Sequence, residues 1–486
     1  MVFSSLIFLY AFLPLSLIAY YLAPTRKAQN TSLLIFSIIF YAWGEPKYVL
    51  LLMFMALTSW FCALRAASSA SARGAKMWVS ISAAIDIALI GFFKYAGLFC
   101  SIFGEVPDFV RSIALPIGIS FYTFQLLTYV IDVYRGDAEA QESYWNVLLY
   151  ASLFHQCIAG PIVRYKTVAD ELFVHREEGP DLLSGIRRFA VGLAKKTLLA
   201  NPCGALADQL LLETSAASDA SLFAQNLASL KSLTVLGSWV GVLAFTLQIY
   251  LDFSAYSDMA IGMGRMIGLH YLENFDYPYI SKSVTEFWRR WHMSLGTFFR
   301  DYVYIPLGGN RCSRARSILN MFIVWALTGL WHGASWNFVM WGLYFFVFLL
   351  LERLFLKKPL RKLRVLPHIY LCFVVYVGWI IFHFTDIRLG WTVFTNLFGL
   401  NGNAFSSFVS KTVLENNLFL LIASCVFCTP LVKNLCLRAG ERLSASETGA
   451  KVWDVLQNCV MPVAFLLLAT CSLVGDSYNP FIYFQF

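Results

Sequence analysis

The sequence predicts an all-α membrane protein built as a bundle of transmembrane helices. Of its 486 residues 58% are hydrophobic and only 14% are charged, whereas soluble domains carry about 25% charged residues. Apolar runs close to the ~20 residues that cross a bilayer recur along the chain. These runs are continuous and lack period-two alternation, which disfavours a β-barrel. We therefore expect residues 1–486 to form a single membrane domain.

The expected membrane segments are the apolar runs between charged or Gly/Pro-containing turns. In chain order they lie near residues 3–23, 32–44, 48–64, 77–103, 113–133, 145–163, 232–268, 318–353, 367–386, 416–432 and 457–475. The runs 232–268 and 318–353 are long enough to be split or broken. The first run lacks the basic segment and small-residue cleavage site of a signal peptide, so we expect it to remain as a helix.

Basic residues indicate which connections face the cytoplasm. Short loops rich in Lys and Arg stay on that side of the membrane. The relevant clusters are Arg26 and Lys27; Arg65, Arg73 and Lys76; Arg311, Arg314 and Arg316; and Lys357, Lys358, Arg361, Lys362 and Arg364. This topology explains the net charge of +8, so we expect membrane lipids and no nucleic acid as partners.

The segment 145–163 does not fit a simple crossing. A polar loop precedes it, and Arg164 and Lys166 follow it, so both flanks look cytoplasmic. Ala159-Gly160-Pro161 also breaks a helix. A re-entrant segment is the interpretation, and such a segment requires surrounding protein or a water-filled cavity.

Residues 164–200 predict an amphipathic helix on the cytoplasmic interface. Its apolar residues share one face, and its cations lie largely elsewhere: Arg187, Arg188, Lys195 and Lys196. Contact with lipid headgroups is the favoured role of these cations, and attraction of an anionic donor is the alternative.

Polar residues interrupt the apolar run 232–268. Asp252 and Asp258 are carboxylates expected at bilayer depth, where they usually face a cavity or a cation. Arg265 follows Asp258 by about two helical turns. A structural ion pair and a substrate contact are both open here.

A second polar stripe lies in the run 113–133. Gln125, Thr128 and Asp132 follow helical spacing and share one face. Hydrogen bonding between helices is the favoured interpretation.

The stretch that begins at Ser283 predicts one aromatic helix. Ser283 and Glu286 fit a capping box, Glu286 and Arg290 are spaced for an ion pair, and His292 lies beside the apolar stripe. Gly308-Gly309 then ends the segment.

His332 stands in an apolar run, where an imidazole is costly unless it has a partner or a task. On a continuous helix Trp325, Gly329, His332 and Trp336 share one face. Gly329 and Gly333 permit close backbone approach, or they leave room for a substrate. A neutral imidazole in an apolar cavity suits a general base. A buried histidine with a purely structural role is the alternative.

Other chemistries are not indicated. The chain has no H-E-x-x-H, no G-x-S-x-G and no phosphate-binding glycine loop. Cys425 and Cys428 form a C-x-x-C inside an apolar run, where metal binding or redox exchange is not expected. We therefore expect no metal and no permanently bound cofactor.

The two histidine stretches resemble the membrane-bound O-acyltransferase family, in its branch of bacterial alginate O-acetyltransferases. They read EFWRRWHMSLGTFFRDYVYIPLGG and LTGLWHGASWNFVMWG. Further similarity lies in FYAWGEP, GFFKYAGLF, LPIGISFYTFQLLTYVIDVYRG, IAGPIVRY and QIYLDFSAYSDMAIGMG. The resemblance covers roughly residues 1–350, and the helices of 351–486 match loosely. His155 stands where relatives commonly carry Pro.

The resemblance implies a helical bundle with interfacial helices around a central tunnel. It implies that His332 lies at the reaction centre as general base and that His292 is the second catalytic residue. His292 would polarise the carbonyl or orient the thioester. Residues expected to contact substrate are Trp331, Trp336, Asp252, Tyr250 and Trp288.

The implied reaction is O-acetylation of a cell-surface polysaccharide or exopolysaccharide such as alginate. The donor would be acetyl-CoA or an acyl-carrier thioester, used from the cytoplasm by a multi-pass protein of the bacterial inner membrane. The choice of acceptor would lie largely with periplasmic acetyltransferase partner proteins. Peptidoglycan, cellulose or teichoic acid as acceptor, a polysaccharide-precursor transporter and an inactive scaffold are the alternatives.

Overall fold

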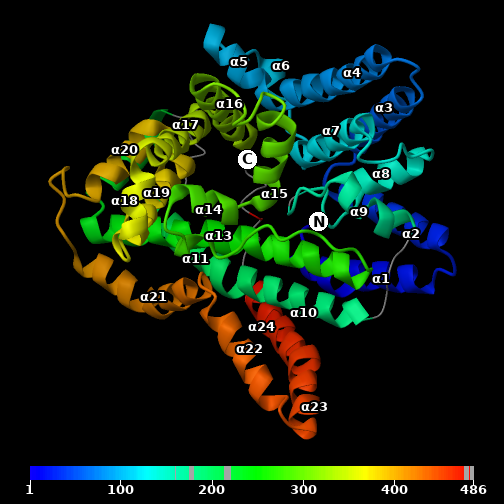
Figure 1. Cartoon of the computed structure of the whole chain (residues 1–486). Helices are drawn as coiled ribbons and strands as arrows, with labels where there is room; N and C mark the ends of the chain where they lie inside the picture. Colours follow the sequence, from blue (N-terminus) through cyan, green and yellow to red (C-terminus); the bar gives the residue numbers. More distant parts are fainter. Residues whose placement is uncertain (159, 175–179, 213–219, 476–480, 482–486) are drawn as a thin grey trace. The chain divides into compact units, whose positions relative to one another are not determined.

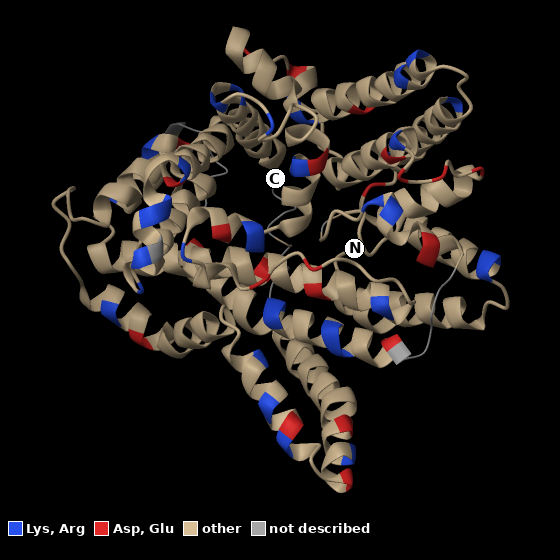
Figure 2. Cartoon of the chain, viewed as in Figure 1, with Lys and Arg blue, Asp and Glu red and all other residues tan. Residues whose placement is uncertain are grey.

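The computed structural model of the chain describes residues 1–158, 160–174, 180–212, 220–475 and 481. Every regular element in these residues is a helix, which confirms the all-α class. Most of the helix length carries no charged residue (Figure 2). Seven of the described helices are long and apolar enough to cross a membrane: Val49–Ala67, Ala72–Phe103, Val235–Met266, Trp336–Leu360, Leu366–His383, Phe408–Phe427 and Glu447–Gly475.

Several other predicted segments are also helical, but they are shorter or less apolar. They are Phe8–Leu22, α2 (Arg26–Gly44), α7 (Ile119–Arg135) and α16 (Arg314–His332). Helix α2 begins at Arg26 because the Thr25 hydroxyl accepts a hydrogen bond from the Ala28 backbone N–H at 3.2 Å. Of the two long predicted runs, 232–268 is the single helix α13 (Val235–Met266). The run 318–353 splits at Gly333.

The chain separates into two compact units. The first holds Met1–Leu193, Tyr256–Glu273 and the described residues from Gln457 to Gly475, and the second holds Ala194–Ala255 and Asn274–Leu456. Helix α13 contributes residues to both units. The prediction of one domain over 1–486 stays a prediction.

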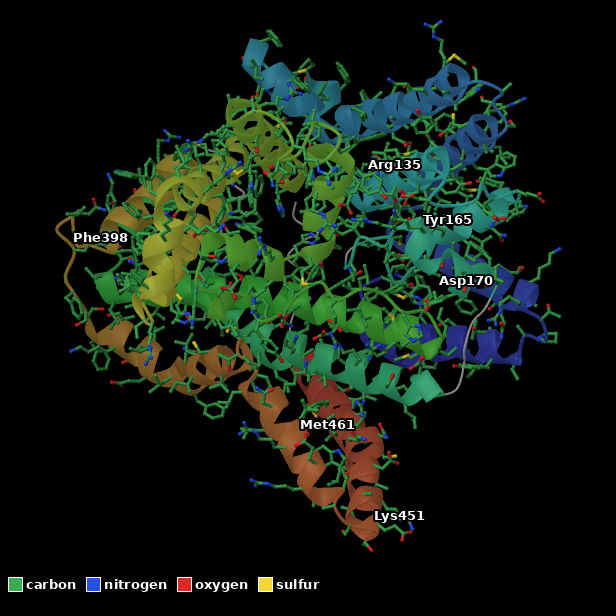
Figure 3. All side chains as sticks on the ribbon, in the orientation of Figure 1. Arg135, Tyr165, Asp170, Phe398, Lys451 and Met461 are labelled. Atoms are coloured by element: carbon green, nitrogen blue, oxygen red, sulfur yellow. The ribbon has the colours of Figure 1, made fainter. Side chains whose placement is uncertain are left out.

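In the first unit α3, α4 and α7 lie side by side (Figure 1). Gln125, Thr128 and Asp132 of α7 are fully buried, as expected of an inward-facing stripe. Tyr165, labelled in Figure 3, is buried at the start of α9. The helices of this unit not yet given are η1 (Phe8–Phe12), α1 (Leu13–Leu22), α3 (Val49–Ala67), α4 (Ala72–Ile90), η2 (Gly91–Tyr95), α5 (Ala96–Phe103), α6 (Asp108–Arg111), α8 (Tyr144–Ser152), α9 (Tyr165–Phe173), most of α10 (Pro180–Lys195) and α24 (Met461–Gly475).

The predicted break in the segment 145–163 is present. Helix α8 ends at Ser152, and the described chain then runs without helix to Arg164. The Phe154 backbone N–H donates to the Ser37 hydroxyl at 3.2 Å. Gly118 has a φ of 76°, and a Cβ there would lie 2.4 Å from the Cys157 carbonyl oxygen. Helix α8 thus ends several residues before Gly160-Pro161. Ala159 lies outside the described residues.

In the second unit α17 packs against both α16 and α19. Helix α14 contacts both α17 and α19. The helices of this unit not yet given are η3 (Lys196–Ala200), α11 (Asn201–Leu211), α12 (Ala220–Ser232), η4 (Pro278–Ile280), α14 (Val284–Arg290), α15 (Met293–Phe299), η5 (Arg300–Tyr304), α17 (Trp336–Leu351), η6 (Glu352–Leu356), α18 (Lys357–Lys362), α19 (Leu366–His383), α20 (Ile387–Asn396), α21 (Phe408–Phe427), α22 (Leu431–Leu443), α23 (Glu447–Val455) and, bordering the first unit, η7 (Leu456–Val460).

Candidate active site

The aromatic stretch after Ser283 is broken at His292, so the prediction of one helix is wrong. Helix α14 ends at Arg290, Trp291 is extended, and α15 begins at Met293. His292 has φ 46° and ψ 53°, in the left-handed region that residues other than glycine rarely adopt. Such a conformation costs about 1–3 kcal/mol and persists only where the surroundings impose it. The backbone therefore leaves the right-handed helical conformation at Trp291 and His292, and this break determines where the His292 ring lies.

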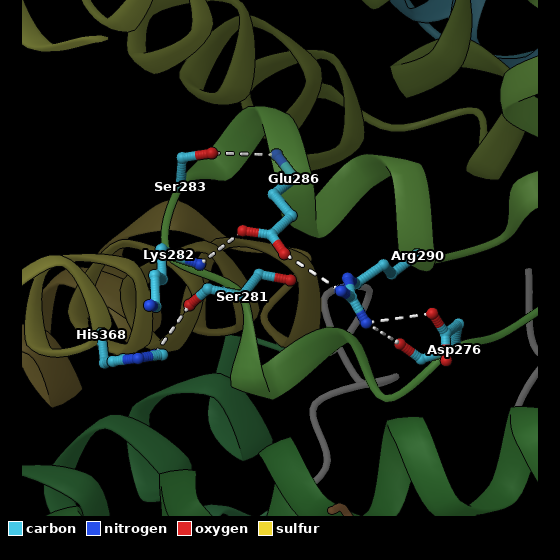
Figure 4. A network of polar contacts seen from close by, with 7 residues as sticks. All are labelled: Asp276, Ser281, Lys282, Ser283, Glu286, Arg290 and His368. Carbon is cyan, nitrogen blue, oxygen red and sulfur yellow. Dashed lines mark hydrogen bonds and ion pairs between the residues drawn. The ribbon is translucent and has the colours of Figure 1, made fainter. Parts of the chain in front are cut away.

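A polar network fixes the start of α14 (Figure 4). The Ser283 hydroxyl accepts from the Glu286 N–H at 3.0 Å, as the predicted capping box requires. The Glu286 carboxylate accepts from the backbone of Lys282 at 3.0 Å, one residue before the expected partner. Its ion pair with Arg290 is confirmed at 3.2 Å. Arg290 also pairs with Asp276 at 2.9 Å, which holds the incoming chain against the helix.

A buried carboxylate also holds α14. Glu352, at the end of α17, accepts from the Val284 N–H at 2.6 Å and from the Thr285 N–H at 2.9 Å. The Thr285 hydroxyl donates to it at 2.6 Å. Three donors thus satisfy a carboxylate that is 3% exposed, and two of them are backbone groups that the helix itself leaves unpaired. Glu352 ties the helix before His292 to α17.

The His292 side chain is 2% exposed and sits between aromatic rings and an amide. Its Nδ1 lies 3.2 Å from Oδ1 of Asn274. Its ring is in edge contact with Phe253, with centroids 4.7 Å apart. Burial lowers the pKa of His292 to about 3, so the ring is neutral at pH 7.

His332 is the last residue of α16 and is 3% exposed. Three aromatic rings surround it: Trp341 at 4.8 Å, Trp331 at 4.9 Å and Phe382 at 5.4 Å between centroids. The Trp331 ring also contacts His292 at 5.6 Å. The two predicted catalytic histidines therefore share one aromatic cluster in the second unit, with Trp331 in contact with both.

Close packing of α16 on α17 explains the glycines near His332. A Cβ on Gly329 would lie 2.4 Å from the Phe338 carbonyl oxygen, and one on Gly342 would lie 2.4 Å from that of Trp325. Beside Gly333 the Phe338 ring fills the space, at 2.2 Å from a Cβ. Close helix approach is therefore the correct interpretation. The alternative, that these glycines leave room for a substrate, is wrong.

A cavity of about 220 Å³ lies in the second unit next to His292. Its wall is largely apolar, and its polar members are His292, Arg300, Tyr304 and Thr328. The lining residues are Trp288, Trp291, His292, Leu295, Gly296, Phe299, Arg300, Tyr304, Met321, Val324, Trp325 and Thr328. Small-molecule sites typically enclose about 300–1,000 Å³, so this cavity suits a small group. A through-going tunnel stays a prediction.

Three of the predicted substrate residues lie near the histidines. Trp288 lines the cavity, and Trp331 contacts both imidazoles. Tyr250 of α13 lies 6.0 Å from the Trp291 ring. Trp336 is elsewhere: α16 ends at His332, so Trp336 starts α17 and is 57% exposed. The prediction that it shares a helix face with His332 is wrong.

Asp252 is used within the protein. Its carboxylate forms an ion pair with Lys196 at 2.6 Å, and their side chains are 1% and 4% exposed. Between the two roles left open for the acidic residues of this run, the geometry favours a structural ion pair.

Two other cations that were expected to contact lipid headgroups, Arg188 and Lys195, instead bind polar side chains of the protein. Arg188 pairs with Asp258 at 2.7 Å and with Glu273 at 2.6 Å. The Asp258 carboxylate is the main cause that raises the pKa of Arg188. Lys195 donates to the Ser254 hydroxyl at 3.2 Å. Asp258 thus pairs with Arg188, a partner other than the Arg265 suggested by spacing, and these cations link helices.

Comparison with known proteins identifies the family. The model of the MBOAT, membrane-bound O-acyltransferase family, matches residues 140–394, which include both histidines. The chain belongs to the membrane-bound O-acyltransferase family. This O-acyltransferase is 35% identical to the probable alginate O-acetylase of Azotobacter vinelandii and 34% identical to that of Pseudomonas aeruginosa, over 100% of each chain. It is 26% identical to the peptidoglycan O-acetyltransferase of Helicobacter pylori, over 100% of this chain and 98% of that one.

The family membership and the apolar helices make the protein a multi-pass membrane O-acyltransferase. Sequence reasoning missed Asn274, Phe253 and Glu352 around His292. Asn274 follows α13 in a segment without periodicity, so no pattern marked it. Glu352 was visible as an acidic residue at the end of an apolar run, but its partners lie 67 and 68 residues away.

Proposed function

We propose that this O-acyltransferase passes an acetyl group from a cytoplasmic thioester, acetyl-CoA or an acyl carrier, across the inner membrane for O-acetylation of alginate or a similar exopolysaccharide. Full-length similarity to two alginate O-acetylases supports this acceptor class. The peptidoglycan relative makes peptidoglycan the alternative acceptor. Periplasmic acetyltransferase partners would receive the acetyl group or supply the acceptor chain.

The observation that carries the mechanism is the pair of histidines around Trp331. In the proposed step, His332 takes the proton of the acceptor hydroxyl while its oxygen attacks the thioester carbonyl carbon. The carbon–sulfur bond then breaks, and the leaving thiolate takes up the proton from the imidazolium. Exclusion of water strengthens the electrostatic interactions among the reacting groups.

Replacement of His332 tests the role of general base. We expect His332→Ala to abolish acetyl transfer, since removal of a positioned base typically costs about 10²–10⁴-fold, while the protein still inserts and folds. His292→Ala should cost less. The measurement is release of free thiol from labelled acetyl-CoA by purified protein in nanodiscs, together with acetyl content of the polysaccharide in cells.

His383→Ala is the matched control because it removes a histidine of the same unit that lies against Phe245, at 4.4 Å. Acetylation retained by His332→Ala would refute the assignment. Substrate movement without thiol release by the wild-type protein would instead favour a transporter.

A further inference from the structure

The side-chain amide of Asn274 contacts His292 and can therefore determine which nitrogen of the His292 ring carries the proton. Asn274 is fully buried and lies between α13 and η4. Its backbone carbonyl accepts from the Met293 N–H at 3.0 Å. Its side-chain Oδ1 lies 2.8 Å from the Ser294 hydroxyl, 3.2 Å from the Ser294 backbone nitrogen and 3.2 Å from Nδ1 of His292.

The backbone N–H of Ser294 decides which end of the amide faces His292. The oxygen and nitrogen of an asparagine side chain have similar shapes, so their assignment rests on their partners. A backbone N–H can only donate, and therefore the Asn274 atom that meets it is the oxygen. The same oxygen faces Nδ1 of His292. An oxygen of a primary amide can only accept. The Ser294 hydroxyl also lies 3.4 Å from Nδ1, but it donates its one proton to the same Asn274 oxygen at 2.8 Å, so Nδ1 has to donate.

We infer that Asn274 holds His292 in the tautomer with the proton on Nδ1, so that His292 meets its substrate through the lone pair of Nε2. A neutral imidazole carries one N–H, on one of its two nitrogens. Burial keeps the ring neutral at pH 7, as its low pKa shows. Asn274 is thus a positioning residue, and the second ring nitrogen of His292, Nε2, is a hydrogen-bond acceptor.

This inference rests on the proposed function and sharpens it. His292 was assigned two possible roles toward the thioester, and polarising the carbonyl requires an N–H at Nε2. The Nδ1–H tautomer excludes that role. His292 instead accepts a hydrogen bond from an O–H or N–H of the bound substrates, which orients them beside His332. The donor to the carbonyl oxygen must come from another group.

The tautomer can be measured directly on the full-length wild-type protein. Solid-state NMR of protein labelled with ¹³C,¹⁵N-histidine in lipid bilayers correlates each ring nitrogen with the carbon bonded to it. The His292 signals are assigned by their loss in His292→Gln. We expect the nitrogen bonded to Cγ to be protonated and the nitrogen bonded to Cδ2 to be bare. A proton on the Cδ2-bonded nitrogen would overturn the inference, whatever the activity of the enzyme.

Substitution of Asn274 tests its consequence for catalysis. Asn274→Ala removes the acceptor, and we expect kcat to fall about 10- to 100-fold, as for other residues that orient a catalytic imidazole. Asn274→Asp keeps an acceptor for both N–H groups, so it should retain most of the wild-type kcat. Its negative charge should raise the pKa of His292, so that a loss of rate caused by protonation of His292 should begin at a higher pH than in the wild type.

Asn396→Ala is the matched control. It also removes a fully buried amide of the second unit, one that donates to the Leu230 carbonyl at 2.7 Å. Its kcat per folded molecule should equal that of the wild type. Equal losses of kcat in Asn274→Ala and Asn274→Asp, at equal amounts of folded protein, would refute the positioning role. If the variants fail to fold, the NMR result on the wild-type protein decides.

Discussion

The imidazole of His292 is held by a left-handed backbone, an amide and aromatic rings, and this setting controls its protonation. Its pKa of about 3 is far below the usual value of about 6.5. The folded state therefore keeps the ring neutral over the whole range in which an exposed histidine titrates. An unfolded chain would take up a proton in that range, so this group lowers stability as pH falls from about 6.5 toward 3.

A pH profile of thiol release tests this setting. We expect no loss of kcat/KM from protonation of His292 between pH 5 and 8, because its pKa lies below that range. Any acidic limb near pH 6.5 should therefore persist in His292→Gln, at a lower overall rate. Disappearance of the limb in that variant would show that His292 titrates near neutrality and that its burial is weaker than described.

At this scale the sequence identified the two histidines and Trp331 but left Asn274 unnoticed. Imidazoles in apolar runs are conspicuous because each is costly to bury. An asparagine in a loop is common, and its value depends on a partner 18 residues away. Asp252 was conspicuous, but its partner was not. A carboxylate expected at bilayer depth indicates that some cation or cavity faces it, and the sequence does not reveal that this cation is Lys196.

His292 lies between the two short helices α14 and α15, and the contact that holds the start of α14 can be removed by mutation. Glu352→Ala would leave the Val284 and Thr285 N–H groups buried without an acceptor. We expect a loss of about 1–3 kcal/mol in stability, from the cost of an unsatisfied group, and a lower kcat as α14 shifts. Glu352→Gln keeps an acceptor oxygen and should lose less.

Thermal unfolding in detergent and thiol release measure the two effects of Glu352. Glu447→Ala is a suitable control because that carboxylate is exposed and pairs only at the surface with Lys451. Unchanged stability and rate in Glu352→Ala would contradict the anchoring role.

The contact of α16 with α17 allows a second test at this scale. Gly342→Ala would bring a methyl group to 2.4 Å from the Trp325 carbonyl oxygen, and backbone cannot move aside as a flexible side chain can. We expect a loss of about 1–3 kcal/mol, typical of overpacking, and a displaced His332. Gly97→Ala, also in a helix but with no atom within 4 Å of the new Cβ, should be tolerated. A Gly342→Ala protein with normal melting temperature and rate would show that the helices can separate freely.

Helix periodicity predicted most elements here but placed two boundaries wrongly. Apolar runs are marked by composition, whereas the breaks at His292 and Gly333 coincide with tertiary contacts: the Asn274 amide in one case and Phe338 in the other. Neither contact leaves a local pattern, so the stretches on both sides read as continuous helices.

At the scale of the whole molecule, the direction of acetyl transfer depends on which connections face the cytoplasm. The loop between the spans Val49–Ala67 and Ala72–Phe103 carries basic flanks, which predicts a cytoplasmic position. Only one span separates this loop from Glu105, so Glu105 is expected on the periplasmic side. This orientation agrees with the proposed reaction, in which the donor thioester is used from the cytoplasm.

Single cysteines at Ala70 and Glu105, both exposed positions, test the orientation in a chain whose eleven native cysteines are replaced. A membrane-impermeant maleimide added to spheroplasts should label Glu105→Cys at once, and Ala70→Cys only after permeabilisation. Acetyl transfer by the cysteine-free chain shows that its fold is retained. The opposite labelling order would place the basic loop outside and would contradict the orientation predicted from the basic flanks.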